Sequence, residues 1–141
     1  MTRRRERIGF ELQILRSYLD PSWVFASDDE RLFLFTGEHG LTVQIALEDF
    51  PYAPPQVVFD RMLYDPEGRP MDSPSHVNHT LPAVDGKTRI CYYKPSRWRS
   101  DESLWMVYCL AILWLEGYRK WMTTGTNTID FWIDRIRNEN A

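Results

Sequence analysis

The feature that most constrains the fold is a long apolar stretch in the second half of the chain. Residues 104–122 are apolar almost all round a helix, and charges enter only with Glu116, Arg119 and Lys120. A helix without a polar face packs inside a core, so we expect this one at the centre of the fold, with Cys109 as ordinary packing. Its longest uncharged run, 104–115, is too short to span a bilayer, and no membrane contact is expected.

Charged and flexible residues suggest where this helix begins and ends. We expect it to begin near Ser100, because Asp101 and Glu102 then place negative charge in its first turn. Gly125 is a suitable residue to end it. A final amphipathic helix is predicted over 128–138, and it offers four apolar side chains to the core: Ile129, Trp132, Ile133 and Ile136.

The front half is predicted to be one helix followed by strands. Residues 3–19 place Ile8, Leu12, Leu15 and Leu19 on one helical face, with Thr2 as the N-cap and Asp20-Pro21 at the end. Strands are expected over 23–27, 31–36, 41–47 and 56–59, and their short links are typical of an antiparallel meander. The predicted fold class is α+β, with an N-terminal helix, a four-stranded antiparallel meander, a cysteine loop and C-terminal helices. The length fits a single domain over 1–141.

The connections between these elements carry two further signals. Residues 50–55 contain Pro51, Pro54 and Pro55. The three prolines make the connection stiff, and a cis peptide bond can occur before one of them. Residues 60–90 show little periodicity and are expected to be irregular, with the polar segment 76–79 as a surface loop. A long irregular segment in a compact domain is itself a pointer to function. His39 lies in a glycine-flanked turn and is expected to be solvated.

Cys91 lies in a segment, 85–98, that no long helix or strand can cross. Gly86 permits an unusual backbone turn, and Pro95 bars a regular helix or a central strand. Basic residues that come within range would lower the pKa of the thiol, and five are close in sequence: Lys87, Arg89, Lys94, Arg97 and Arg99. A buried structural cysteine is the alternative, because free cysteine is among the most buried residue types. The residues alone leave both interpretations open.

Composition narrows the classes of function. The net charge of -3 and the pI near 5.6 give no general signature of nucleic-acid binding. The two cysteines lie far apart and none of the three histidines pairs with a cysteine at ligand spacing, so we expect no disulfide framework, metal or cofactor. The basic start lacks the apolar segment of a signal peptide, and the cytoplasm is the expected compartment.

Three segments, taken in order, resemble the ubiquitin-conjugating enzyme family. The run Phe-Pro-Tyr-Ala-Pro-Pro-Gln-Val-Val-Phe at 50–59 resembles the family's tyrosine-proline segment and fourth strand. His76-Val77-Asn78 resembles a variant of its His-Pro-Asn motif, with valine in place of proline. The run from Gly86 to Cys91 resembles its approach to the catalytic cysteine. Segments 91–98, 114–118 and 121–125 resemble the bacterial branch, found in antiphage operons of the CBASS or the ubiquitin-like type.

The resemblance implies a transferase with a cysteine thioester. Cys91 would take an activated protein C-terminus from an activating enzyme and pass it to an amine of a target protein. The transferred protein would be a ubiquitin-like modifier or, in CBASS, the cyclic-nucleotide synthase, and the chain does not separate the two. The family's asparagine, which stabilises the oxyanion or orders the loop, lies eight residues before the cysteine, where this chain has Ala83. Asn78, His79 or a backbone amide is therefore expected in that role.

Asp101 and Glu102 are further candidate site residues, and two other functions are compatible with the sequence. Asp101 and Glu102 match the family's acidic residues that orient an incoming lysine, and helix capping explains them equally well. The main alternative function is a non-catalytic binding module of the same fold, which the displaced asparagine favours. A redox thiol protein is a third, although Cys91 has no second cysteine close by in sequence.

Overall fold

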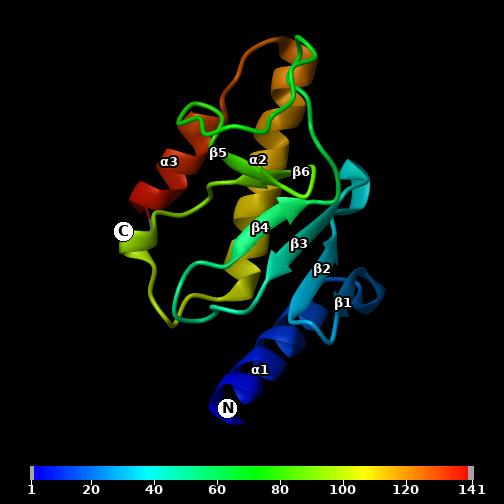
Figure 1. Cartoon of the computed structure of the whole chain (residues 1–141), viewed down its shortest axis with the longest axis vertical. Coiled ribbons are helices and arrows are strands. Elements are labelled where there is room, and N and C mark those ends of the chain that lie inside the picture. Colours follow the sequence, from blue (N-terminus) through cyan, green and yellow to red (C-terminus); the bar gives the residue numbers. More distant parts are fainter. Residues whose placement is uncertain (1, 140–141) are drawn as a thin grey trace.

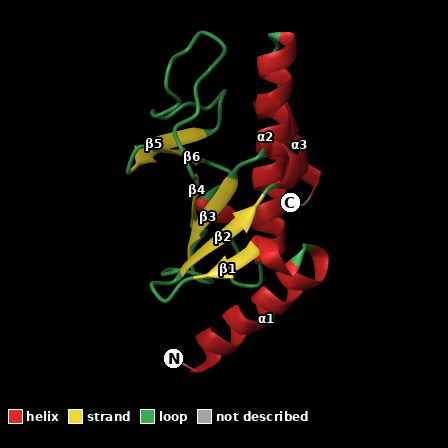
Figure 2. Ribbon diagram, turned by 90° about the vertical axis from the view of Figure 1, so that its right-hand side faces the viewer, coloured by secondary structure: helices red, strands yellow, loops and turns green. Residues whose placement is uncertain are grey.

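A computed structural model describes residues 2–139 of the chain, and side chains are described for residues 3–135. The described chain folds into one antiparallel sheet and three helices: α1 (Thr2–Tyr18), α2 (Leu104–Thr124) and α3 (Ile129–Glu139). Figure 2 shows α2 along one face of the sheet, with α3 beside it and α1 at its lower end. The α+β class with an N-terminal helix, an antiparallel sheet and C-terminal helices is confirmed.

The first four strands follow the predicted meander. They are β1 (Val24–Ala26), β2 (Arg31–Phe35), β3 (Thr42–Ala46) and β4 (Gln56–Phe59), and each pairs with the next. Alternate residues face the core, since Leu32 pairs with Ile45 and Leu34 with Val43, and all four are fully buried. This alternation of buried and less buried residues fixes the register of the pair, because a slip by one residue would turn the apolar side chains away from the core.

The sheet has six strands in the part of the chain that the structure describes, two more than the predicted four-stranded meander. Strands β5 (Thr80–Val84) and β6 (Lys87–Ile90) extend it in the order β1-β2-β3-β4-β6-β5 (Figure 1). They form a hairpin whose turn, Asp85-Gly86, has positive φ at both residues, 51° and 73°. Asp-Gly is a strong hairpin signal. The hairpin was not predicted, because residues 60–90 were expected to be irregular.

The rest of that segment, 60–79, lies outside the named strands but is tied to the body. Leu63 and Met71 are buried, and the Tyr118 hydroxyl of α2 donates a hydrogen bond to the Tyr64 carbonyl over 2.7 Å. The segment therefore packs over the C-terminal part of α2. Its fixed path delivers residues 78 and 79 to the start of β5.

Helix α2 begins later than predicted, and a residue of α1 explains why. Ser103 is the N-cap, its hydroxyl accepting from the Met106 amide over 3.0 Å. The Leu104 amide donates to the carboxylate of buried Glu11 over 2.8 Å, and Arg7 pairs with the same carboxylate. Because these groups satisfy the first turn, Asp101 and Glu102 lie before the helix and not in it. The predicted stop at Gly125 is confirmed, with φ of 78°.

The prediction that α2 is buried all round is also wrong. One face is buried in the core, including Leu104, Ala111 and Trp114, but Cys109 is exposed on the other. Helix α3 packs against α2 through the fully buried Ile129 and Ile133. The predicted core residue Ile136 lies outside the described side chains.

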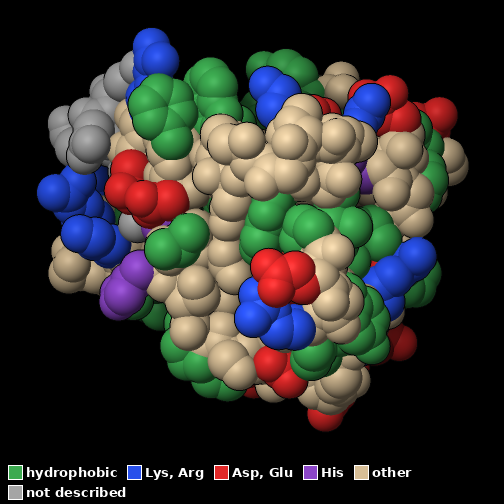
Figure 3. Space-filling view, turned by 90° about the horizontal axis from the view of Figure 1, so that it is seen from above, with side chains coloured by type: hydrophobic (Ala, Val, Ile, Leu, Met, Phe, Trp, Pro, Cys, Tyr) green, Lys and Arg blue, Asp and Glu red, His purple; other side chains and the backbone are tan. Residues whose placement is uncertain are grey.

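The described residues contain no helix that is long and apolar enough to cross a membrane. The face seen from above mixes acidic, basic and apolar side chains, and no single charge dominates it (Figure 3).

Candidate active site around Cys91

The β5–β6 hairpin brings Cys91 next to His79. The Cys91 amide donates a hydrogen bond to the His79 carbonyl over 2.8 Å, one step beyond the pairing of Thr80 with Ile90. Cys91 is partly exposed, at the point where β6 ends. Residues twelve apart in sequence therefore become neighbours, because the chain between them doubles back. The hairpin therefore brings the backbone of the polar segment beside the cysteine, although thirteen residues separate Asn78 from Cys91 in sequence.

His79 is held in an unusual conformation. Its backbone φ is +51°, a region that few non-glycine residues occupy. Its side chain is 7% exposed, and the ring Nε2 lies 2.6 Å from Oδ1 of Asp130 on α3. Strained residues cluster at functional sites, so the outlier itself supports a functional hypothesis here.

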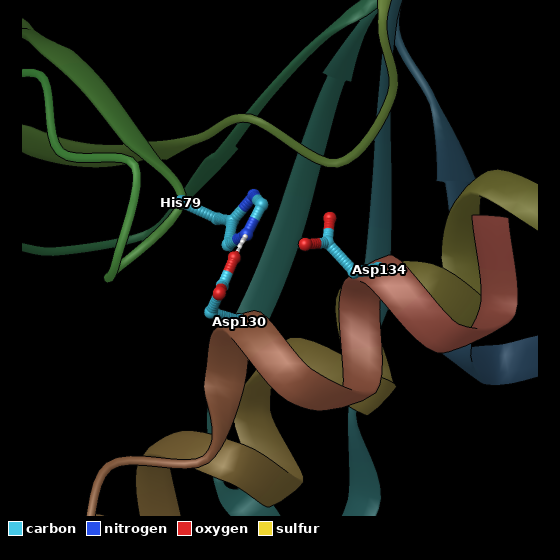
Figure 4. A group of neighbouring side chains, drawn as sticks. All are labelled: His79, Asp130 and Asp134. Atoms are coloured by element: carbon cyan, nitrogen blue, oxygen red, sulfur yellow. Dashed lines mark hydrogen bonds and ion pairs between the residues drawn. The ribbon is translucent and has the colours of Figure 1, made fainter. Parts of the chain in front are cut away.

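A second carboxylate lies beside this pair. Asp134 is one helical turn beyond Asp130, and the ligand atoms of His79, Asp130 and Asp134 all lie within 4.8 Å of one another. Figure 4 shows the His79 ring directed at Asp130, with both aspartates on the side of α3 that faces it. Sequence analysis missed this group, because 51 residues separate His79 from Asp130.

Asn78 is anchored by both its backbone and its side chain. Its carbonyl accepts from the indole Nε1 of buried Trp114 over 2.8 Å. Its Oδ1 accepts from Nδ2 of Asn127 over 2.8 Å, and Asn127 Oδ1 in turn accepts from the Ile129 amide at the start of α3. An oxyanion role would fall to the Asn78 Nδ2 group, because that group is the donor of the amide. Asn78 thus links the cysteine region to both C-terminal helices.

The loop after Cys91 is fixed to the proline-rich segment. The Tyr92 hydroxyl donates to the Pro55 carbonyl over 2.6 Å, and Trp98 Nε1 donates to the Pro51 carbonyl over 2.8 Å. Burial raises the pKa of Tyr92 well above its usual value, which keeps it a neutral donor. The cis bond allowed by sequence is found at Phe50–Pro51. These contacts pin the segment on either side of the exposed residues 94–97.

The two predicted acidic residues lie near this loop in different surroundings. Glu102 accepts a hydrogen bond from the Tyr93 hydroxyl over 2.9 Å, and its backbone carbonyl accepts from Arg7. Burial, and then this carboxylate, raise the pKa of Tyr93. Asp101 is exposed and pairs with Arg99 over 3.0 Å. Glu102 is therefore tied to the cysteine loop, whereas Asp101 lies on the surface before α2.

His39 and Cys109 differ from their predictions. The His39 side chain is 7% exposed and its Nε2 lies 3.0 Å from Glu116 on α2, so the expectation of a solvated histidine is wrong. It borders a cavity of about 320 Å³ between the turn Gly37–His39 and the C-terminal part of α2. Cys109 is exposed, yet partial burial of the thiol raises its pKa.

Comparison with known proteins gives no match: no protein-family model, curated protein or solved structure matches the chain. The chemistry of the site therefore rests on the residues and their geometry.

Proposed function

We propose that this chain is a ubiquitin-conjugating-enzyme-like transferase that carries an activated protein C-terminus as a thioester on Cys91. The observation that carries the proposal is the contact between Cys91 and His79 through the β5–β6 hairpin. It gives the cysteine a polar, strained neighbour and leaves the cysteine itself partly open to solvent. Reactive cysteines need that access, whereas structural ones are inert in the interior.

The proposed reaction has two steps. The Cys91 thiolate attacks the carbonyl carbon of the C-terminus held as a thioester on the activating enzyme. A new C–S bond forms, the C–S bond to the activating enzyme breaks, and the cysteine of that enzyme departs as a thiolate. A target amine then attacks the same carbon, so that a C–N bond forms, the C–S bond breaks and Cys91 leaves as thiolate. The extra proton of the amine passes to a base or to water. Covalent catalysis of this kind divides one transfer into two easier steps.

The surrounding residues have distinct roles in this proposal. The Nδ2 group of Asn78 is the candidate donor to the oxyanion, and Trp114 and Asn127 hold the residue in place. His79 supports the position of Cys91 through the backbone hydrogen bond. Glu102, which accepts a hydrogen bond from Tyr93, is the stronger candidate of the two acidic residues for orienting an incoming lysine, because exposed Asp101 is paired with Arg99.

The expected partners are an activating enzyme, a target protein and either a ubiquitin-like modifier or a cyclic-nucleotide synthase, in bacterial antiphage defence. A non-catalytic adaptor of the same fold is the second candidate. The side-chain hydrogen bond of Asn78 to Asn127 favours it, because an amide used to dock α3 needs no catalytic role to explain it.

A thioester assay separates the two candidates. The purified chain is mixed with the activating enzyme, ATP and a candidate modifier, and the products are run on non-reducing gels. The transferase gives a band that reducing agent removes, that is absent or converted to a stable oxyester in Cys91→Ser, and that persists in the control Cys109→Ser. A stable complex with no covalent band supports the adaptor instead. An equal, reducible band in Cys91→Ser would show that the thioester forms elsewhere and would reject the proposed site.

A further inference from the structure

We propose that His79, Asp130 and Asp134 form a binding site for a divalent transition metal ion, with zinc as the best fit. One imidazole nitrogen and two carboxylate oxygens lie within 4.8 Å of one another, and they come from two segments that are far apart in sequence. Zinc takes nitrogen and oxygen ligands of this kind, and sites with three protein ligands keep a fourth position for water. Imidazole favours zinc over magnesium, which prefers oxygen ligands and retains its water shell.

The ligand types differ in mobility in the way that a metal site needs. The His79 imidazole is buried, with a 7% exposed side chain, and the strained backbone and the Cys91 hydrogen bond fix its position. The Asp130 side chain is 51% exposed and Asp134 is exposed, so both carboxylates have room to rotate toward an ion. A fixed nitrogen and two adjustable oxygens can reach the ligand distances of about 2.0–2.2 Å that zinc requires.

The position of the two aspartates on α3 is the second reason for the proposal. They stand at i and i+4 on one helical face, and like charges at this spacing destabilise a helix. Asp130 lies 2.6 Å from the His79 ring, and Asp134 adds a second carboxylate whose oxygen lies within 4.8 Å of the same imidazole. A cation shared by both carboxylates accounts for the pair and for their common direction toward the imidazole (Figure 4).

Metal binding here would clamp α3 to the start of β5, next to Cys91. It does not depend on the thioester reaction, and it can be tested by binding alone. Zinc is titrated into the full-length chain by calorimetry, and the Tm is followed with increasing zinc, because a ligand that binds only the folded state raises Tm. One ion per chain and a zinc-dependent rise in Tm are expected.

Two variants test the ligands, and two control for other histidines. Asp134→Asn keeps the His79–Asp130 pair and removes one metal ligand. His79→Asn removes the imidazole while keeping a residue type that tolerates positive φ. Each is expected to weaken zinc binding by at least the roughly 10–100-fold that loss of a second-shell partner costs. His76→Asn, an exposed imidazole three residues away, and His39→Asn, the other buried histidine, should bind zinc as the wild type does.

Cobalt substitution identifies the coordinating atoms. Co²⁺ bound by nitrogen and oxygen gives ligand-field absorption without a thiolate charge-transfer band, and Cys91→Ser/Cys109→Ser should leave this spectrum unchanged. Circular dichroism of each variant confirms that it is folded. The proposal is overturned if zinc at millimolar concentration neither releases heat nor raises Tm. It is equally overturned if folded Asp134→Asn and His79→Asn retain wild-type affinity.

Discussion

The described part of the chain contains two histidine–carboxylate pairs that look alike and are built differently. In both, an imidazole with a 7% exposed side chain meets a half-exposed carboxylate on a C-terminal helix, Glu116 for His39 and Asp130 for His79. His39 sits in a 3₁₀ turn between two glycines of positive φ, so glycine carries the unusual backbone there. At His79 the histidine itself has positive φ.

This difference in the backbone distinguishes the structural ion pair of His39 from the candidate site at His79. Around His39, the turn needs only glycines and one ion pair to close over α2. Around His79, an L-residue is kept in a sparsely populated conformation while its carbonyl binds Cys91 and its neighbour Asn78 binds Trp114. Such strain persists only where surrounding contacts enforce it. The equal burial of the two imidazoles therefore says less about function than the backbone beneath them.

The largest expected effect comes from moving α3, which carries one partner of the His79 pair. A Cβ added at Gly117 would lie 2.9 Å from Cγ1 and 3.2 Å from the backbone Cα of Ile129. Because part of that clash is with backbone, Gly117→Ala should lower the free energy of unfolding by about 1–3 kcal/mol. It should also weaken zinc binding at His79 and leave the turn at His39 in place.

Urea denaturation and zinc titration of the Gly117→Ala protein measure both effects. Gly9→Ala is the matched control, because nothing lies within 4 Å of a Cβ at this helical position. The control should be stabilised by roughly 0.5–1 kcal/mol, the usual gain of alanine over glycine in a helix. Equal stability of Gly117→Ala and the wild type would mean that α3 is not packed tightly on α2.

The next effect tests the backbone difference directly and has opposite signs at the two histidines. At His79, glycine relieves a positive φ that costs alanine about 1–2 kcal/mol, so His79→Gly should be more stable than His79→Ala. In the 3₁₀ turn, φ is negative and glycine only adds entropy to the unfolded chain. His39→Gly should therefore be less stable than His39→Ala, by roughly 0.5–1 kcal/mol.

Each alanine–glycine difference is obtained from the midpoints of paired denaturation curves, which cancels the loss of the imidazole itself. If the sign is the same at both positions, the strain at His79 does not distinguish the two pairs, and backbone strain no longer supports a functional site there.

Sequence patterns predicted the parts of this fold that local chemistry decides. The predicted bounds of β2 and β3 and the predicted stop of α2 at Gly125 agree with the structure within a residue or so. The start of α2 was wrong because its first amide is capped by Glu11, a side chain 93 residues away. The prediction that Cys109 packs in the core was wrong, because an apolar helix in a small protein has too few neighbours to cover every face.

Only part of the candidate site could be predicted, because the site also depends on contacts between residues that are far apart in sequence. Cys91, Asn78 and His79 could be named from motifs. The Asp85-Gly86 turn, which brings this part of the chain together, was not recognised as a hairpin turn. Asp130 and Asp134 carried no signal, since their spacing is that of any solvated helical face. The tertiary contacts of α3, such as the packing of Ile129 and Ile133, bring them to His79.

The smallest expected effect extends the comparison from the histidines to the two thiols. Cys109 lies on the same helix as Glu116, the partner of His39, and partial burial raises the pKa of its thiol. Only the thiolate reacts with iodoacetamide, so near neutral pH Cys109 in a Cys91→Ser protein should react several-fold more slowly than a free thiol. The raised pKa also predicts that its rate keeps rising above pH about 8.5, where a free thiol levels off.

The Cys109→Ser protein reports the labelling of Cys91 alone, and mass spectrometry over time gives the rate for each cysteine. Faster labelling of Cys91 agrees with a thiol positioned for attack in an open loop, whereas equal rates and equal pH profiles would place the two cysteines in the same class and remove the chemical distinction between the two regions.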